Sequence, residues 1–475
     1  MADGVVETEL GKVAGKAREG HWSYRAIPFA RPPLGELRFA GPRPAEPWSG
    51  VRDATRYSPI ALQGAVFAPG VGAEGVQSED CLYLNVYTPA ADGARRPVMF
   101  FIHGGAFTVG SASARLYDGA KLAALHDVVV VTTNYRLGAL GYLPIGELNR
   151  GSLDQLAALQ WVQTNIARFG GDAANVTIFG ESAGASSVCL LMAMPRARGL
   201  FARAIVQSAS LALELPTVES LAPITQAFTL QDRTGSSSEE LLQAQKAVEA
   251  DWTKWPHFQP VASPLFGGQP RESFDAEQGS KVPLLIGYNR DEWNLFAAMD
   301  VPSWSKPLSD EELRAQTKVS ADVVEVYRAS RASRGLPNSN RALLRAILGD
   351  LRFRLPTLRF AERYRSLADT YFYQFTYASP GLRGELGACH ALELPFVFGS
   401  YDTPGQDRFA GSGEHVERLS ATMRDRWTTF ARGEAPWARY GEARETMELD
   451  LEPRLVNDSY GEERAALSSE KAPAR

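Results

Sequence analysis

Short runs of apolar residues recur along the chain, separated by stretches with helical spacing. The run from Val98 to Ile102 is continuous, and the run from Val128 to Thr133 is rich in β-branched residues, as in strands buried on both faces. From Ser152 to Arg168 apolar residues recur every three or four positions, which predicts an amphipathic helix that Ser152 caps. This alternation predicts an α/β fold with a large, mostly parallel central sheet flanked by crossover helices. Strands are predicted at 82–87, 98–102, 128–133, 176–179, 204–207, 282–288 and 370–377, and helices at 183–194 and 414–432.

Other regions fall outside this repeat. Val5 to Tyr57 is rich in Gly and Pro, which predicts small antiparallel strands in an irregular lead-in. Residues from about 210 to 280 and from 300 to 367 favour helical insertions that form a lid or side lobe, and the polar residues 461–475 suggest a loose tail. We therefore expect a single domain over residues 1–475.

Composition and charge narrow the classes of partner. The chain is 44% hydrophobic and 22% charged, as in globular proteins. A net charge of −5 without a Lys/Arg cluster argues against nucleic acid. No stretch of 18 apolar residues and no signal-peptide pattern are present, so we expect no membrane partner and a cytoplasmic location. The three cysteines, Cys81, Cys189 and Cys389, are far apart and match no metal spacing, so neither a disulfide framework nor a metal site is expected.

One pentapeptide carries the strongest chemical signal. Residues 180–184 read Gly-Glu-Ser-Ala-Gly and lie between the strand ending at Phe179 and an apolar helix that stops at Pro195. Gly-x-Ser-x-Gly in this setting is a nucleophile elbow, a turn so tight that only glycine fits at the positions two residues before and two residues after the serine. Ser182 is therefore the candidate nucleophile, and the following helix directs its N-terminal N–H groups toward an oxyanion beside it.

A second glycine-rich turn follows the strand 98–102. It reads His103-Gly104-Gly105-Ala106-Phe107. Glycines directly after a buried strand allow the backbone to point its N–H groups into a cavity, as an oxyanion hole requires.

A serine hydroxyl needs a histidine to remove its proton and a carboxylate to orient that histidine. In this fold the acid and then the histidine follow the serine along the chain, which excludes His21, His103 and His126. His257 precedes the later acid-bearing strand, and His415 begins an amphipathic helix, which leaves His390. Asp291 and Glu292 both end the strand 282–288, and their spacing does not distinguish them.

The chain resembles a type-B carboxylesterase, the family that includes bacterial para-nitrobenzyl esterases, animal carboxylesterases and cholinesterases. The resemblance covers nearly the whole chain and implies an α/β-hydrolase fold. The matching motifs are Ile27–Pro33, Gly35–Phe39, Ser78–Asn85, His103–Phe107, Asn134–Arg136, Ala158–Gly184, Asp291-Glu292 and Gly387–Gly399.

The resemblance also assigns roles to residues. It implies that Glu292 is the triad acid and His390 the base. Gly105, Ala106 and Ala183 match the oxyanion-hole positions. Glu181 resembles a buried glutamate behind the triad, and Ser208 is expected to join its network. Structural ion pairs are implied between Arg38 and Glu79 and between Arg136 and Asp172.

Two departures from the family pattern affect these expectations. Cys81 matches a cysteine that closes a disulfide in secreted relatives, but no earlier cysteine exists here. Trp293 follows Glu292 where many relatives have Gly, so a bulky ring is expected near the acid. The Gly-Gly-Ala turn also implies room for branched alcohols, on the condition that Ala106 has a negative φ.

The predicted function is that of a serine carboxylesterase, which hydrolyses carboxylic esters through an acyl-enzyme without metal or cofactor. Its partner is a small ester, and the protein is expected to be a monomer or weak dimer. A non-catalytic, cholinesterase-like binding protein is the alternative, but such proteins lose a triad member, and all three are present here. Sequence does not exclude amides, carbamates or thioesters as substrates, because the triad serves all of them.

Overall fold

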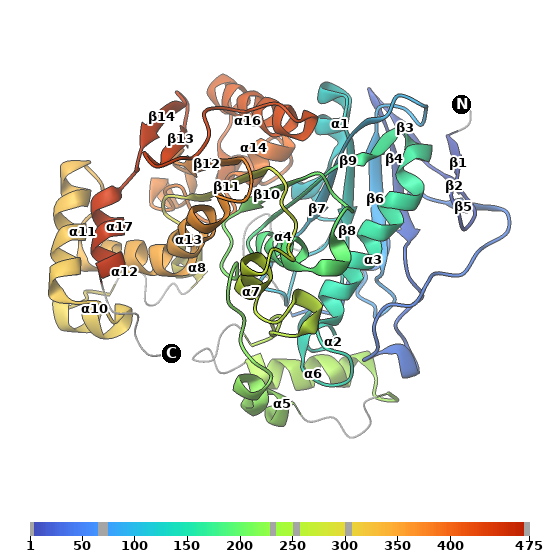
Figure 1. The fold of residues 1–475 in the computed structure, drawn as a ribbon, viewed down its shortest axis with the longest axis horizontal. Helices are drawn as coiled ribbons and strands as arrows, with labels where there is room; N and C mark the ends of the chain where they lie inside the picture. The colour runs from blue at the N-terminus through green and yellow to red at the C-terminus, as the bar shows by residue number, and fades with distance from the viewer. Residues whose placement is uncertain (1–3, 65–74, 229–233, 250–256, 300–305, 470–475) are drawn as a thin grey trace.

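A sheet of eleven strands runs through the molecule (Figure 1). The computed structural model describes residues 4–64, 75–228, 234–249, 257–299 and 306–469. From one edge to the other the strands are β14 (Arg454–Asn457), β13 (Glu445–Leu449), β12 (Thr370–Phe375), β11 (Leu284–Asn289), β10 (Arg203–Gln207), β9 (Gly171–Glu181), β7 (Arg96–Ile102), β8 (Val129–Thr133), β6 (Tyr83–Thr88), β4 (His21–Pro28) and β3 (Lys16–Arg18).

The middle of the sheet is parallel, from β8 through β7, β9, β10, β11 and β12 to β13. Strands β6, β4 and β3 on one side and β14 on the other pair antiparallel. Every residue of β8, β11 and β12 is buried, because helices cover both faces of a parallel sheet. The predicted strands and the α/β-hydrolase fold are thus confirmed, with strand ends shifted by a few residues.

Alternate residues of the central strands enter different cores. In β7, Val98, Phe100 and Ile102 belong to one core, and Met99 and Phe101 belong to the other. The first core also contains α3 (Arg150–Asn165) and α4 (Ala183–Ala193), and the second contains α1 (Ala120–His126), α14 (Leu394–Phe398) and α16 (Glu414–Arg432). Two helical layers therefore enclose the sheet.

Helix α3 begins two residues before Ser152, so the expectation that Ser152 caps it is wrong. Asn149 is the residue that precedes the helix, in a left-handed conformation with φ of 56°. Helices α4 and α16 match their predicted ranges closely.

The lead-in forms a small sheet of β1 (Val5–Glu7), β2 (Lys12–Ala14) and β5 (Val51–Asp53). The other helices are α2 (Gly138–Tyr142), α5 (Ala222–Ala227), α6 (Ser238–Glu249), α7 (Pro270–Asp275), α8 (Trp293–Met299), α10 (Asp310–Thr317), α11 (Ala321–Ser333), α12 (Asn340–Gly349), α13 (Leu355–Tyr364), α15 (Asp407–Ala410) and α17 (Gly461–Ser469).

A side lobe of α10, α11, α12 and α17 stands at the left of Figure 1 and has its own small core. Leu467 of α17 is part of that core, and Glu463 is also buried. The expectation of a loose tail is therefore wrong for residues 461–469, which form a helix that buries Glu463 and Leu467. Residues 470–475 lie outside the described part of the chain.

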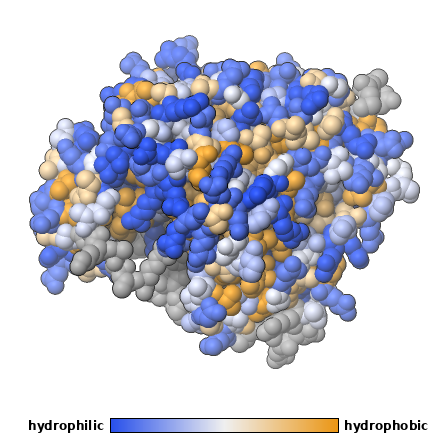
Figure 2. Space-filling view, viewed as in Figure 1, coloured by the Kyte–Doolittle hydropathy of each residue, from blue (hydrophilic) through white to orange (hydrophobic). Residues whose placement is uncertain are grey.

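The surface gives no sign of a large apolar patch on the face viewed in Figure 2, where hydrophobic residues form small groups among hydrophilic ones. Across the described ranges, no helix combines the length and the apolar character needed to span a bilayer. Cys81, Cys189 and Cys389 are free and buried.

Candidate active site

The candidate residues gather at the carboxyl ends of neighbouring parallel strands. The glycine-rich turn follows β7, Ser182 follows β9, Ser208 follows β10, and Glu292 lies three residues past β11. His390 lies on the loop after β12. Backbone hydrogen bonds connect these strand ends, from Ser182 N–H to the Gln207 carbonyl and from Ser208 N–H to the Gly287 carbonyl, both at 2.8 Å. The carboxyl edge of the sheet thus brings residues far apart in sequence into one site.

Ser182 occupies a strained turn, with φ of 58° and ψ of −120°. The turn is tight because a Cβ on Gly180 would come within 2.6 Å of the Gly184 backbone and 2.7 Å of the Ile102 carbonyl oxygen. Strain of about 1–3 kcal/mol at a non-glycine residue persists only where the surrounding structure holds it. The geometry is that of a nucleophile elbow.

His390 is held by Glu292. The distance from His390 Nδ1 to Glu292 Oε2 is 2.5 Å, and both side chains are buried. The other carboxylate oxygen of Glu292, Oε1, accepts hydrogen bonds from the Ser208 hydroxyl at 2.6 Å and from the Asn289 N–H at 2.8 Å. Nδ1 therefore carries the proton that faces Glu292, and Nε2 is left as the basic nitrogen.

The adjacent carboxylate, Asp291, has different partners. Its Oδ2 accepts from the Ala388 N–H at 3.0 Å and pairs with Arg290 at 2.9 Å, and Arg331 lies 3.8 Å from its Oδ1. The Asp291 N–H in turn donates to the Ala388 carbonyl at 2.9 Å. Asp291 thus fixes the backbone of the loop that carries His390, and it is Glu292 that contacts the imidazole.

Glu181 lies on the other side of the imidazole. Its Oε1 is 3.0 Å from His390 Nε2, although the two atoms lack hydrogen-bond geometry and neither has another hydrogen-bond partner among the described residues. Ser182 Oγ makes no hydrogen bond to His390 in this arrangement. Nε2 nevertheless faces Glu181, the residue immediately before Ser182. Ser208 hydrogen-bonds to Glu292, which is itself bound to the same imidazole that Glu181 faces.

Charges around the imidazole shift two pKa values. Burial alone would lower the pKa of His390, but Glu181 and Glu292 outweigh it and raise the pKa to about 9. Burial raises the pKa of Glu181 to about 8.

The turn after β7 holds three successive residues at positive φ. Gly105, Ala106 and Phe107 have φ values of 108°, 52° and 63°. No acceptor among the described residues hydrogen-bonds to the N–H groups of Gly105, Ala106 or Ala183. These three donors are therefore available at the edge of the sheet where Ser182 lies. The expected room for branched alcohols required a negative φ at Ala106. The φ of Ala106 is positive, so that requirement is not met.

Helix α2 and the residues after it support this turn. The Gly138 N–H donates to the Phe107 carbonyl at 2.7 Å, and the Phe107 ring packs edge-on against Tyr142 at 4.9 Å. The segment from Ala139 to Glu147 wraps around the buried guanidinium of Arg150. That guanidinium donates to the carbonyl oxygens of Ala139, Leu140, Leu143, Ile145 and Glu147.

Aromatic rings cover the open side of the imidazole. The centroid of Phe353 is 4.5 Å and that of Phe296 5.1 Å from the His390 ring. Trp293 packs on Phe296 at 4.9 Å. Trp293 is thus one ring away from the base.

Sequence reasoning missed Glu393, which is buried three residues after His390. It accepts hydrogen bonds from Gln207 at 3.0 Å and from Asn289 at 2.6 Å, and burial raises its pKa. A signal for it was available, because a lone acid in the apolar stretch 391–398 next to the candidate histidine indicates a buried carboxyl group.

Two ion pairs were expected to support the site. Arg38 and Glu79 form one of them, at 2.6 Å and buried. The pairing of Arg136 with Asp172 is wrong. Arg136 makes a two-pronged contact with Asp154 of α3, at 2.7 and 2.8 Å, while Asp172 at the exposed start of β9 binds Arg95 at 3.1 Å. Asp154 is fully buried and is therefore the carboxylate able to neutralise a buried guanidinium.

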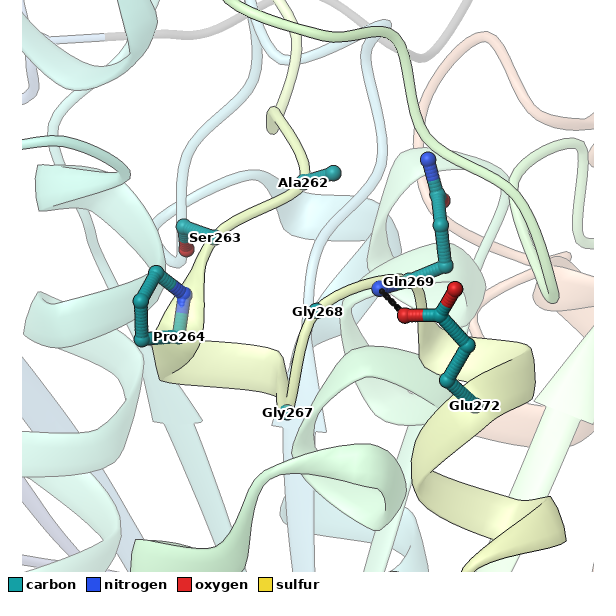
Figure 3. Close-up of a pocket in the computed structure, with 7 residues that line it drawn as sticks. All are labelled: Ala262, Ser263, Pro264, Gly267, Gly268, Gln269 and Glu272. Carbon is teal, nitrogen blue, oxygen red and sulfur yellow. Dashed lines mark hydrogen bonds between the residues drawn. The ribbon is translucent and has the colours of Figure 1, made fainter.

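A surface hollow of about 550 Å³ lies elsewhere, lined by Ala262, Ser263, Pro264, Gly267, Gly268, Gln269 and Glu272 (Figure 3). Its one acid, Glu272, accepts from the Gln269 N–H at 3.0 Å and so caps α7. None of the candidate catalytic residues lines it. No group of three or more His, Cys, Asp or Glu side chains in the described ranges is arranged to hold a metal ion.

Comparison with known proteins supports the same chemistry. The model of the carboxylesterase family matches residues 2–467. Para-nitrobenzyl esterase of Bacillus subtilis is 38% identical, over 99% of this chain and 100% of that protein. Human cocaine esterase is 34% identical, over 94% of this chain and 88% of that protein.

The fold agrees equally well with solved structures. Carboxylesterase EST55 of Geobacillus stearothermophilus has a TM-score of 0.86 and 39% identity, covering 98% of this chain and 99% of its own. A para-nitrobenzyl esterase structure has a TM-score of 0.84 with the same coverage. Similarity over the full length, in sequence and in fold, shows that this chain belongs to the type-B carboxylesterase family and hydrolyses carboxylic esters.

Proposed function

We propose that Ser182, His390 and Glu292 hydrolyse the ester through a covalent acyl-enzyme. The observation that carries this proposal is the 2.5 Å contact between His390 Nδ1 and Glu292, which leaves Nε2 facing the nucleophile elbow. The strained conformation of Ser182 supports its role as nucleophile, because such strain is retained where function requires it.

In the first half of the reaction Ser182 Oγ attacks the ester carbonyl carbon while His390 Nε2 takes the hydroxyl proton. The carbonyl oxygen becomes an oxyanion that accepts hydrogen bonds from the N–H groups of Gly105, Ala106 and Ala183. Loss of one such donor typically costs about 10²–10³ in rate. His390 then gives its proton to the departing alcohol, and Glu292 stabilises the imidazolium in between.

In the second half water replaces the alcohol. His390 removes a proton from water, the hydroxide attacks the acyl carbon, and the Ser182–acyl bond breaks as the serine recovers its proton. The products are a carboxylic acid and free enzyme. Both halves use the same donors and the same base.

Phosphonylation tests the assignment directly. A para-nitrophenyl phosphonate ester should transfer one phosphonyl group to Ser182 as para-nitrophenolate leaves, with the adduct located by peptide mass spectrometry and activity lost in proportion to labelling. The Ser182→Ala variant should take up no adduct and hydrolyse no para-nitrophenyl ester. An adduct on another residue, or turnover by Ser182→Ala, would refute the nucleophile.

We further propose one catalytic unit over residues 1–475, acting as a monomer or weak dimer in the cytoplasm. Support for a single unit comes from the core that includes both Val6 and Tyr440. Support for the compartment comes from three free, buried cysteines. Dithiothreitol should therefore leave the melting temperature unchanged.

The oligomeric state is tested separately, by size-exclusion chromatography with light scattering.

A further inference from the structure

A π-helical turn, η8 (Asp350–Arg354), interrupts the path from α12 to α13. Single π turns are rare and often occur at functional sites, because the extra residue rotates the side chains that follow it. Here the turn carries Phe353, whose ring centroid lies 4.5 Å from His390 and 5.7 Å from Phe296. The turn thus brings an apolar ring against the face of the imidazole.

The two ends of the turn, Asp350 and Arg354, are held by a buried polar cluster. Arg354 Nη1 donates to Asp350 at 2.8 Å and lies 3.4 Å from Glu463 of α17. Arg354 Nη2 donates to the carbonyl oxygens of Ser459 and Tyr460, at 2.8 and 2.6 Å.

Helix α11 completes the cluster. Ser330 donates to the second oxygen of Glu463 at 2.9 Å, and the Tyr327 hydroxyl donates to Asp350 at 2.5 Å. Asp350, Arg354 and Glu463 are each less than one-tenth exposed. One guanidinium therefore joins the π turn to the C-terminal segment 459–463 inside the protein.

We propose that this C-terminal segment acts as a brace that positions the catalytic histidine. Glu463 and the carbonyls of Ser459 and Tyr460 hold Arg354, Arg354 fixes the π turn, and the turn presses Phe353 against His390. The proposal rests on the proposed role of His390 as the base. Asp350, Arg354, Glu463 and Phe353 are positioning residues, since each of them acts through His390.

The physical need for a brace follows from how His390 is held. Glu292 fixes Nδ1, but one hydrogen bond leaves the ring free to tilt about it, and the ring faces are fixed only by packing. A displacement of about 1 Å in a catalytic group can cost about 10²-fold in rate. A π turn has weak hydrogen bonds of its own, so its register depends on outside partners, and Arg354 supplies them.

The test uses full-length protein and four single variants: Phe353→Leu, Arg354→Met, Glu463→Ala and the control Glu462→Gln. Glu462 is the neighbouring glutamate on α17, with a side chain 70% exposed. We expect the first three variants to lower kcat about three- to tenfold with KM within about twofold, because alignment of the base is lost while substrate binding is kept. Glu462→Gln should match the wild type.

A second readout separates positioning from stability. Diethyl pyrocarbonate modifies accessible neutral imidazoles, and His390 is only 4% exposed. The treatment is done above the raised pKa of His390 and well below the melting temperature, and the modified peptide is measured by mass spectrometry. Modification of His390 should be at least about threefold faster in the three variants. Arg354→Lys should have a higher kcat than Arg354→Met, because lysine keeps a positive charge between Asp350 and Glu463. Its kcat should stay below the wild type, because one ammonium group cannot also make the two hydrogen bonds to the Ser459 and Tyr460 carbonyls.

The proposal is wrong if Arg354→Met and Glu463→Ala melt at lower temperature yet keep wild-type kcat and a wild-type rate of His390 modification. If Arg354→Met does not fold, Arg354→Lys and Phe353→Leu decide in the same way. Failure of the proposed base is a separate outcome: His390→Ala would then retain turnover in an otherwise unaltered protein.

Discussion

Asp291 and Glu292 are neighbours in sequence, yet their carboxylates serve different parts of one loop. Glu292 meets the ring of His390 at 2.5 Å, and Asp291 accepts from the Ala388 N–H at 3.0 Å. One residue orients the imidazole and the other fixes the backbone that carries it. The choice between them, which spacing leaves open, follows from these contacts.

Glu292→Gln should therefore reduce kcat by about 10⁴, since an amide no longer selects the tautomer that leaves Nε2 basic. Asp291→Asn should reduce kcat by about tenfold or less but lower the urea midpoint, because it loses its charged partners Arg290 and Arg331. Steady-state kinetics and urea unfolding of both variants check this. The opposite order of kcat losses would exchange the two roles.

The pH dependence of kcat/KM follows from the raised pKa of His390. Only the neutral imidazole accepts the serine proton, so activity is lost as the pH falls through that pKa. The acid limb should lie above 6.5, the ordinary histidine value. Glu181→Gln removes a negative charge 3.0 Å from Nε2, which destabilises the imidazolium and should move the limb to lower pH. A limb that stays in place, or moves upward, would contradict this account.

The strain at Ser182 predicts that removing the Cβ at this position stabilises the folded protein. Ser182→Ala keeps a Cβ at φ of 58°, whereas Ser182→Gly removes it. Both variants should be inactive, and the glycine variant should be more stable than the alanine variant by about 1 kcal/mol, the lower end of the strain range. Urea unfolding curves of the two variants make the comparison. A glycine variant that is less stable than the alanine variant would indicate that the elbow is unstrained, because glycine also loses more chain entropy on folding.

The corrected ion pair gives a test of the fold. Arg136→Met leaves Asp154 charged and buried, which should cost about 3–5 kcal/mol of unfolding free energy. Arg95→Met is the matched control, because the Arg95 side chain is 72% exposed and its pair with Asp172 should contribute no more than about 1 kcal/mol. Similar losses in the two variants would argue against Asp154 as the partner of Arg136.

The sequence predicts the strand order along the chain and the elbow well, because buried parallel strands and Gly-x-Ser-x-Gly leave local signals. It fails where a contact depends on tertiary geometry. The partner of Arg136 is set by which carboxylate is buried beside it, and Glu393 joins the site through Asn289, 104 residues away in the chain. Helix α17 was missed because only Glu463 and Leu467 of its nine residues are buried, which is too few for a clear apolar period.

Arg150 gives the segment from Ala139 to Glu147 what a bound calcium ion gives many extracellular loops, a cation surrounded by backbone oxygens. This cation is covalently part of the chain, so its occupancy is complete at any salt concentration and no chelator can extract it. Because Arg150 is the first residue of helix α3, the segment that supports Phe107 is tied by its backbone oxygens to the start of that helix.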